Sequence, residues 1–267
     1  RRVHSLMGLW LVLYLFVHLL TNSQAALWIG DDGSGFVAMV NSLESLPYLQ
    51  VIASLFIGLP LAIHAVWGIQ RIFQARTNSS KTDGSRPSIR SPRNRAFTWQ
   101  RLSSWIVLFG LLYHVIDMRF LDKPTEVKYQ NRTWFLAPLT FDEGLTTLAP
   151  RLDTQLYRAG AIPAQWGEWK LESDEVLVVA PLPGTAFLLV VRDTFKDLWV
   201  CAFYTLFVLA AAFHAFNGFW TSLITWGALL SYRSQRAMIP VSVVGMGLLS
   251  FLGLAAIWGS YWINLRN

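Results

Sequence analysis

The sequence predicts an all-α membrane protein in which five transmembrane helices form a bundle. The 267 residues are 54% hydrophobic and only 14% charged, whereas a soluble domain carries about 25% charged residues. Several near-continuous apolar runs are each long enough to cross about 30 Å of hydrocarbon as a helix. The single cysteine, Cys201, excludes a disulfide framework within the chain.

Motifs of several other classes are absent from the sequence. It contains no CxxC or CxxCH, which excludes iron–sulfur ligation by this chain and covalent haem attachment. It contains no GxGxxG and no P-loop pattern, so we expect no dinucleotide or nucleoside triphosphate site. The net charge of +6 could indicate nucleic acid binding, but in a chain buried mostly in lipid it is better explained by membrane orientation, and we expect no nucleic acid partner.

The first two expected spans each contain a histidine. Val3–Leu20 follows two arginines and contains His18. A signal peptide has a similar order of basic start, apolar run and small residues, but this run is long for such a peptide, so we expect a helix. The second span, Leu49–Ile69, contains His64, and the loop before it, Thr21–Pro47, has no lysine or arginine.

The linker over residues 71–101 determines the expected orientation. It carries eight basic residues against one acid, Asp83. The basic residues are Arg71, Arg76, Lys81, Arg86, Arg90, Arg93, Arg95 and Arg101. Short loops rich in lysine and arginine remain in the cytoplasm. We therefore expect this loop and the N-terminus to be cytoplasmic and the C-terminus, at Asn267, to be outside.

The remaining apolar runs complete the five spans. They are Leu102–Met118 with His114, Leu198–Trp220 with His214, and Met238–Ile263 without a histidine. The organisation is therefore residues 1–118 with three helices, a long outer loop over residues 119–197, and residues 198–267 with two helices. Within the outer loop, EVLVVA and TAFLLVV flank Pro-Leu-Pro-Gly, which predicts a β-hairpin over residues 175–191.

The four histidines fall into two layers when their depth is measured along each helix. At a rise of about 1.5 Å per residue, His18 and His114 lie roughly 25 and 20 Å from the inner surface. His64 and His214 lie roughly 25 Å from the outer surface, hence in the inner half. Histidines that deep in a membrane are functional candidates by default. The depths pair His64 with His214 and His18 with His114.

Two facing imidazoles per layer suit a haem iron. Zinc or non-haem iron normally recruits carboxylate or thiolate ligands as well, and these spans offer no acid at those depths. An iron held by two imidazoles has no open position, which suits electron transfer. Gly68, Gly218 and Gly110 lie four residues from a histidine on the same helix face, which leaves room for a flat macrocycle. The alternative is that the histidines form interhelical hydrogen bonds and the glycines are packing contacts.

Four segments together resemble a known family. In order they are RRVHSLMGLWLVLYLFVHLLTN, SLPYLQVIASLFIGLPLAIHAVWG, QRLSSWIVLFGLLYHV and FHAFNGFWTSLITWG followed by RSQR. They resemble the dihaem cytochrome b membrane anchor of succinate:quinone oxidoreductases (succinate dehydrogenase and fumarate reductase), of the single-anchor, five-helix type. The resemblance covers all five expected helices, while the outer segment over residues 119–197 is longer than is usual for the family.

The resemblance implies two non-covalent b haems. The proximal haem would have His64 and His214 as axial ligands, and the distal haem would have His18 and His114. It implies a cytoplasmic flavoprotein subunit with FAD, where succinate and fumarate interconvert, and an iron–sulfur subunit on the inner face. Electrons would pass between that subunit and a membrane quinone, usually menaquinone, in the respiratory chain of a bacterial inner membrane.

Further site residues are expected at the two surfaces. The family has an acid implicated in proton exchange near the distal haem, matched here by Glu44, although an exposed loop acid or a helix-terminal charge explains this residue equally well. Among candidates for the haem propionates, His4 lies near the inner interface. The three basic candidates are Arg2, Arg71 and Arg101, whose charge could also serve orientation alone.

Two other functions stay open from the sequence. One is the dihaem anchor of a different quinone-linked enzyme, of the nitrate reductase or formate dehydrogenase type, which would copurify with a molybdenum protein. The other is a transporter without haem whose histidines relay protons.

Overall fold

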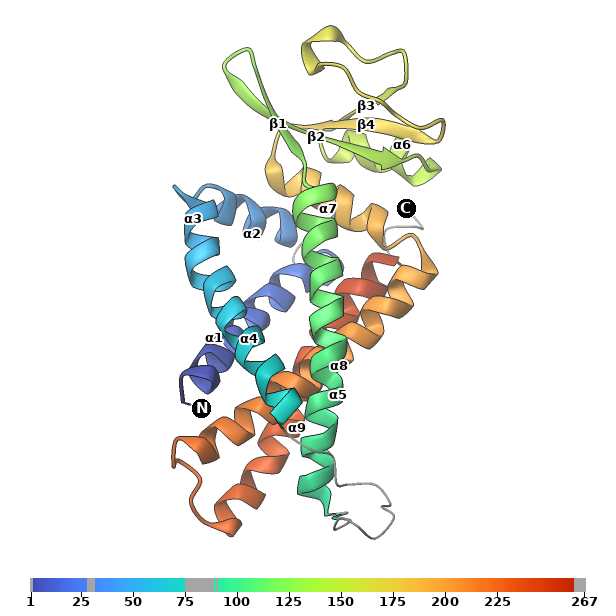
Figure 1. The fold of residues 1–267 in the computed structure, drawn as a ribbon. Helices are drawn as coiled ribbons and strands as arrows, with labels where there is room; N and C mark the ends of the chain where they lie inside the picture. The colour runs from blue at the N-terminus through green and yellow to red at the C-terminus, as the bar shows by residue number, and fades with distance from the viewer. Residues whose placement is uncertain (1, 28–31, 75–88, 90, 262–267) are drawn as a thin grey trace. The chain divides into compact units, whose positions relative to one another are not determined.

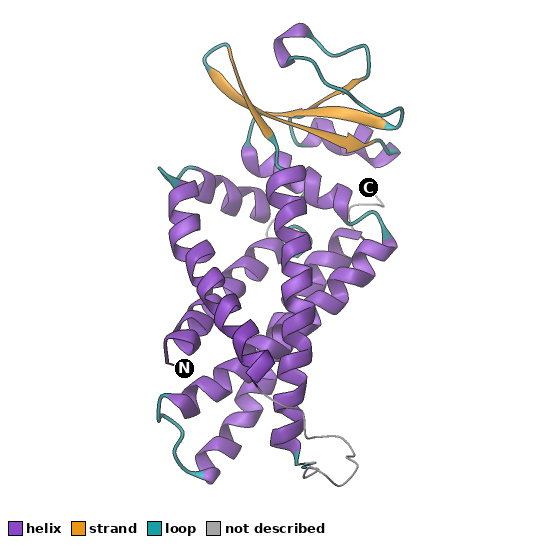
Figure 2. Cartoon of the chain, in the orientation of Figure 1, coloured by secondary structure: helices purple, strands orange, loops and turns teal. Residues whose placement is uncertain are grey.

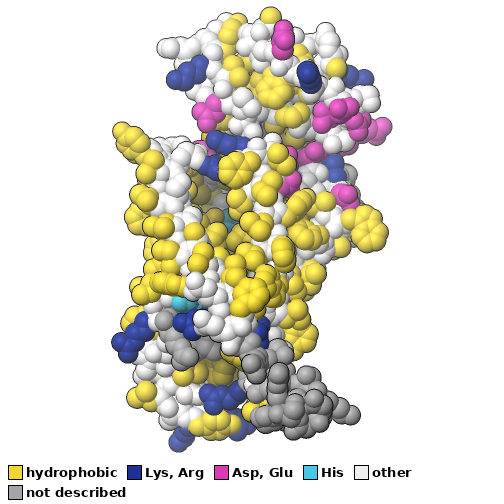
Figure 3. All heavy atoms as spheres, in the orientation of Figure 1, with side chains coloured by type: hydrophobic (Ala, Val, Ile, Leu, Met, Phe, Trp, Pro, Cys, Tyr) yellow, Lys and Arg dark blue, Asp and Glu magenta, His cyan; other side chains and the backbone are white. Residues whose placement is uncertain are grey.

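The structure is a computed structural model that describes residues 2–27, 32–74, 89 and 91–261. Within this part, five helical segments are long and apolar enough to cross a membrane, which confirms the expected number of spans. They are Arg2–Ser23, Leu49–Gln74, Pro92–Leu121, Leu198–Thr225 and Tyr232–Gly259. Hydrophobic side chains cover much of their visible surface in Figure 3. The central part of the basic linker (Arg76, Lys81, Arg86 and Arg90) and the C-terminus at Asn267 lie outside the described residues.

The chain divides into two compact units, each described here by itself. Unit 1 consists of Arg1–His18, Gln50–Leu112 and Leu206–Phe251. Unit 2 consists of Leu19–Leu49, Tyr113–Thr205 and Leu252–Asn267.

The spanning helices of Figure 1 are mostly longer than the apolar runs that predicted them. They are α1 (Arg2–Ser23), α3 (Leu49–Ala53) continued by η1 (Ser54–Gly58) and α4 (Leu59–Gln74), α5 (Pro92–Ile116) with η2 (Asp117–Leu121), α8 (Leu198–Thr225), and α9 (Tyr232–Leu254) with η4 (Ala255–Gly259). The third span begins at Pro92 rather than Leu102 because its first turns are polar, which hydropathy misses. Proline at the first helical position lacks only an N–H that would be unpaired there.

Two glycines of unit 1, Gly110 and Gly245, lie in close contact with an aromatic side chain of another helix. A Cβ atom at Gly110 would lie 2.4 Å from the Phe207 ring, and one at Gly245 would lie 2.1 Å from the Phe216 ring. Small residues let helices approach in a membrane. Gly110 therefore fits the packing interpretation of the glycines rather than space for a macrocycle.

Unit 2 contains a small antiparallel sheet (Figure 2). Its strands, in spatial order, are β1 (Thr125–Tyr129), β2 (Arg132–Thr140), β4 (Glu175–Ala180) and β3 (Gln155–Arg158). Strands β1 and β2 form a hairpin whose two turn residues, Gln130 and Asn131, both have positive φ. Two consecutive residues in this conformation match the right-handed twist of a hairpin.

The hairpin expected over residues 175–191 is wrong in its second half. EVLVVA is strand β4, but TAFLLVV lies in helix α7 (Pro183–Thr194). Pro183 begins this helix at a favourable first position. An apolar run without alternation does not by itself distinguish a buried strand from a buried helix. In α7, consecutive residues Leu188, Leu189 and Val190 are all buried because packing surrounds the helix.

Strand β4 is covered on both faces, which explains its continuous apolar sequence. Val176 and Val178 pack with Leu189 of α7 and with α6 (Glu143–Arg151). On the other face, Leu177 and Val179 pack against Trp166. The sheet therefore contributes two hydrophobic clusters to unit 2.

A short helix within the expected loop at residues 21–47 completes this unit. Helix α2 (Ser34–Glu44) packs on α7, where Gly184 donates its backbone N–H to the Asn41 side-chain oxygen at 2.8 Å. A Cβ atom at Gly184 would lie 2.5 Å from the Val37 carbonyl oxygen, so the two helices touch through their backbones.

A buried ion network joins α6 and α7. Arg192 is 1% exposed and donates two hydrogen bonds of 2.7 Å to the Asp142 carboxylate. Asp142 also caps α6 by accepting from the Leu145 N–H, and Lys196 lies 2.5 Å from it. Burial alone would raise the pKa of Asp142, but the hydrogen bonds from Arg192 and Lys196 lower it below its ordinary value.

Candidate functional site

Unit 1 brings together the two histidines that the sequence assigns to the inner layer. His64 lies on α4 and His214 on α8. Their ring centroids are 6.2 Å apart and their ring planes are nearly perpendicular, at 86°. The two imidazoles therefore face one region of the unit, although they are 150 residues apart in the sequence.

The His64 ring is held by α1. Its Nδ1 lies 3.1 Å from the backbone carbonyl oxygen of His4. A Cβ atom at Gly8 would lie only 2.9 Å from the same ring, so α1 approaches closely there. Metal-bound histidines usually donate their second ring N–H to a carbonyl or carboxylate. The contact with His4 leaves Nε2 of His64 as the nitrogen able to bind a ligand.

The His214 ring is held by an amide relay. Gln100 of α5 places its Nε2 atom 3.2 Å from Nδ1 and 3.0 Å from the backbone oxygen of His214. Asn217 donates to the Gln100 side-chain oxygen at 2.8 Å. Gln100 and Asn217 were not among the residues predicted from the sequence. A usable signal was present, because Asn217 follows His214 by three residues and so shares its helix face.

His4 belongs to the same cluster. Its ring stacks on that of His64, with centroids 4.2 Å apart and planes 10° apart. Its Nε2 atom is buried and has no hydrogen-bond partner among the described residues. A buried polar nitrogen without a partner is costly, so this atom indicates a place for a hydrogen-bonding group from outside the described residues.

The glycines next to the inner histidines border the cluster without crowding it. A Cβ atom at Gly68 would lie 3.7 Å from Nε2 of His4, and one at Gly218 would lie 3.5 Å from Nε2 of Gln100. Both are ordinary contact distances. These two glycines therefore face the histidine cluster, as the sequence analysis expected.

The inner histidines fit an iron held between them. Metal–nitrogen bonds to histidine are about 2.0–2.1 Å long, so two axial imidazoles have ring centroids about 6 Å apart. The observed 6.2 Å agrees with this value. Across the described residues, no three side chains of His, Cys, Asp or Glu gather as a metal site. His64 and His214 together offer two imidazole nitrogens, a pair of donors that suits haem.

The predicted propionate residues have other contacts in unit 1. The Arg2 guanidinium lies 5.7 Å from the centre of the Trp226 ring. Arg101 donates to the backbone oxygen of Ile72 at 2.7 Å, near the end of α4. Arg71 is half-buried in the last turn of α4. The described residues of unit 1 include no Asp or Glu.

The outer histidines fall in different units. His18 is in unit 1, where its ring lies 5.6 Å from that of Tyr14. His114 is in unit 2, where its Nδ1 lies 3.2 Å from the Tyr204 hydroxyl. Their pairing stays a prediction. Glu44 is the half-buried last residue of α2, outside the second span. It therefore lies at a helix C-terminus, where the helix dipole disfavours a carboxylate.

The comparison with known proteins agrees with this organisation. The chain is 26% identical over 259 residues to the succinate dehydrogenase cytochrome b558 subunit of Bacillus subtilis (strain 168). The match covers 97% of this chain and 94% of that protein. No family model and no solved structure matches the chain. The relative and the five spans confirm the resemblance seen in the sequence: this is a multi-pass membrane protein similar to the cytochrome b anchor of succinate dehydrogenase.

Proposed function

We propose that the chain is the haem-binding membrane anchor of a succinate dehydrogenase and that His64 and His214 are the axial ligands of a b-type haem. The observation that carries the proposal is the 6.2 Å separation of these two imidazoles on two different helices. The relative, which aligns over nearly the whole chain, supports the assignment to this enzyme.

The residues around the two imidazoles have distinct roles in this proposal. The His4 carbonyl fixes the orientation of the His64 ring, and Gln100, held by Asn217, fixes that of His214. Nε2 of His4 is placed to donate to a propionate or other acceptor at the edge of the site. A haem with two imidazole ligands supplies one-electron transfer without an open coordination position. The apolar surfaces of the helices keep water away from this site.

A second haem, bound by His18 and His114 in the outer layer, completes the proposed function. Electrons would then cross between an iron–sulfur subunit on the cytoplasmic face and a membrane quinone, which we expect to be menaquinone. The flavoprotein subunit with FAD would interconvert succinate and fumarate. Glu44 is the proposed proton-exchanging residue on the outer side. The basic inner loop supports a cytoplasmic N-terminus in a bacterial inner membrane.

Purification in mild detergent tests the proposal directly. We expect two haems per chain, b-type bands in a reduced-minus-oxidised spectrum, and copurification of a flavoprotein and an iron–sulfur subunit. A colourless pure protein would rule out the haem assignment. Copurification of a molybdenum protein in place of the flavoprotein would be compatible with the haem assignment but would exclude succinate dehydrogenase.

A further inference from the structure

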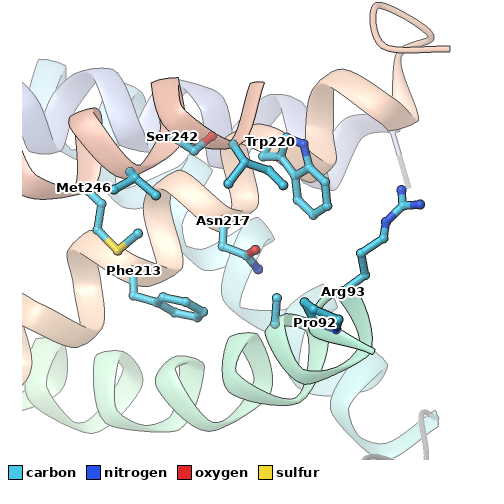
Figure 4. Close-up of a pocket in the computed structure, with 10 residues that line it drawn as sticks. Pro92, Arg93, Phe213, Asn217, Trp220, Ser242 and Met246 are labelled. Carbon is cyan, nitrogen blue, oxygen red and sulfur yellow. The ribbon is translucent and has the colours of Figure 1, made fainter. Parts of the chain in front are cut away.

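Unit 1 contains a cavity of about 200 Å³ between α5, α8 and α9, which borders the histidine cluster at Asn217. Most of its lining is apolar and includes Ala96, Phe213, Val243 and Met246. Figure 4 shows Phe213 and Met246 at one end and Trp220 and Arg93 at the other. The cavity therefore has an apolar end and an end that carries a cation.

The cation at this end is held between aromatic rings. The Arg93 guanidinium lies 5.6 Å from the centre of the Trp220 ring and 5.8 Å from that of Tyr232. It also donates to the side-chain oxygen of Gln235, whose backbone oxygen accepts from the Trp220 indole at 2.9 Å. These partners orient the guanidinium but are all neutral. Its charge is therefore available to an anion.

In the part of unit 1 that the structure describes, no carboxylate is available to Arg93. These residues include seven arginines and no Asp or Glu. The arginines are Arg2, Arg71, Arg93, Arg95, Arg101, Arg233 and Arg236. Basic pockets between transmembrane helices on the cytoplasmic side typically bind anionic lipid headgroups. The unit therefore has the charge that complements such a lipid.

A second polar group in the cavity lacks a partner. The Ser242 side chain is 7% exposed, and its hydroxyl has no hydrogen-bond partner in the part of the chain that the structure describes. This residue lines the cavity from α9 (Figure 4). A buried hydroxyl at a cavity wall offers a donor to an acceptor that enters the cavity.

We propose that this cavity binds an anionic phospholipid, with its phosphate on Arg93 and one acyl chain against the apolar wall. The Ser242 hydroxyl is then available to donate to an oxygen of the lipid. An uncharged lipid would make the same apolar contacts but would leave the Arg93 charge without an anion. The site therefore distinguishes lipids by headgroup charge.

Native mass spectrometry of the delipidated protein, purified with its bound subunits, tests the proposal. The probes are phosphatidylglycerol and phosphatidylcholine with identical acyl chains. We expect tighter binding of phosphatidylglycerol. Arg93→Gln should reduce this preference about fivefold, the effect of one basic residue near an anionic lipid. Arg93→Lys should retain most of the preference, because it keeps the charge.

Two further variants distinguish lipid binding in the cavity from a general attraction of anionic lipids to the basic surface. Arg95→Gln removes an exposed arginine in the same first turn of α5 that does not line the cavity, and it should leave the preference unchanged. Val243→Trp should fill the cavity and weaken binding of both lipids. Equal binding of the two lipids by the wild type would overturn the proposal. So would an equal loss in the Arg93 and Arg95 variants, or a quinone that displaces the lipid.

Discussion

The histidine cluster of unit 1 and the ion network of unit 2 stabilise buried polar groups in different ways. In the cluster, the hydrogen bonds join an imidazole with a carbonyl, an amide with an imidazole, and amides with each other, and none of them involves a carboxylate or a guanidinium. In unit 2, Arg192 is buried with a charged partner, Asp142. Charges are expensive within hydrocarbon, whereas a segment beside water can bury a paired charge. The uncharged side chains of the cluster are therefore compatible with binding a ligand within hydrocarbon, whereas the ion network stabilises the fold of unit 2.

The largest expected effect comes from removing a proposed ligand. His64→Ala should lower the haem content from two per chain to one, because it removes one of the two imidazoles of the proposed ligand pair. A pyridine haemochrome assay measures the content. His4→Ala is the matched control, because the His4 carbonyl that orients His64 stays in place and the haem content should stay at two. Unchanged haem in the His64 variant would contradict the ligand assignment.

Removing the acid of the ion network should destabilise unit 2. Asp142→Ala leaves Arg192 buried without its carboxylate, and breaking a buried pair costs about 3–5 kcal/mol. Thermal unfolding of the purified protein measures the loss. Replacing both partners, as Asp142→Leu with Arg192→Met, should recover much of it because no buried charge is left unpaired. If the single and double variants were equally stable, the unpaired charge of Arg192 would not be the cause of the lost stability.

A smaller effect is expected from the amide that holds His214. Gln100→Leu removes the amide that donates to the His214 backbone oxygen and lies beside Nδ1 of its ring, so we expect faster haem loss from this variant. The rate of haem loss to a haem-scavenging protein measures the effect. Gln70 is an exposed glutamine of α4, and Gln70→Leu serves as the control. Equal rates in the two variants would exclude a role for Gln100 in holding His214.

Acid should weaken the ion network while leaving the neutral cluster contacts in place. The pKa of Asp142 is lower in the folded protein than its ordinary 3.8, so near and below pH 3.8 the unfolded chain binds more protons. Stability should therefore fall as the pH drops below about 4. Thermal unfolding between pH 6 and pH 3 measures the slope, which should be shallower in Asp142→Asn. Parallel slopes would show that other carboxylates cause the acid sensitivity.

The sequence determined the features that depend on local composition. Uninterrupted apolar runs require a helix in lipid, because the backbone must satisfy its own hydrogen bonds there. The five spans were therefore predictable, and the helical rise paired His64 with His214, whose rings the structure brings together. The same reasoning failed for residues 185–191, where an apolar run fits a buried helix and a buried strand equally well.

Only the tertiary structure decided which side chains meet. The roles of Gln100 and His4 depend on how α5 and α1 pack beside α8 and α4, and no local pattern encodes that contact. The same holds for Arg192, whose partner Asp142 is 50 residues away. Periodicity describes which face of an element is apolar, whereas a contact between distant residues depends on the packing of whole elements against one another.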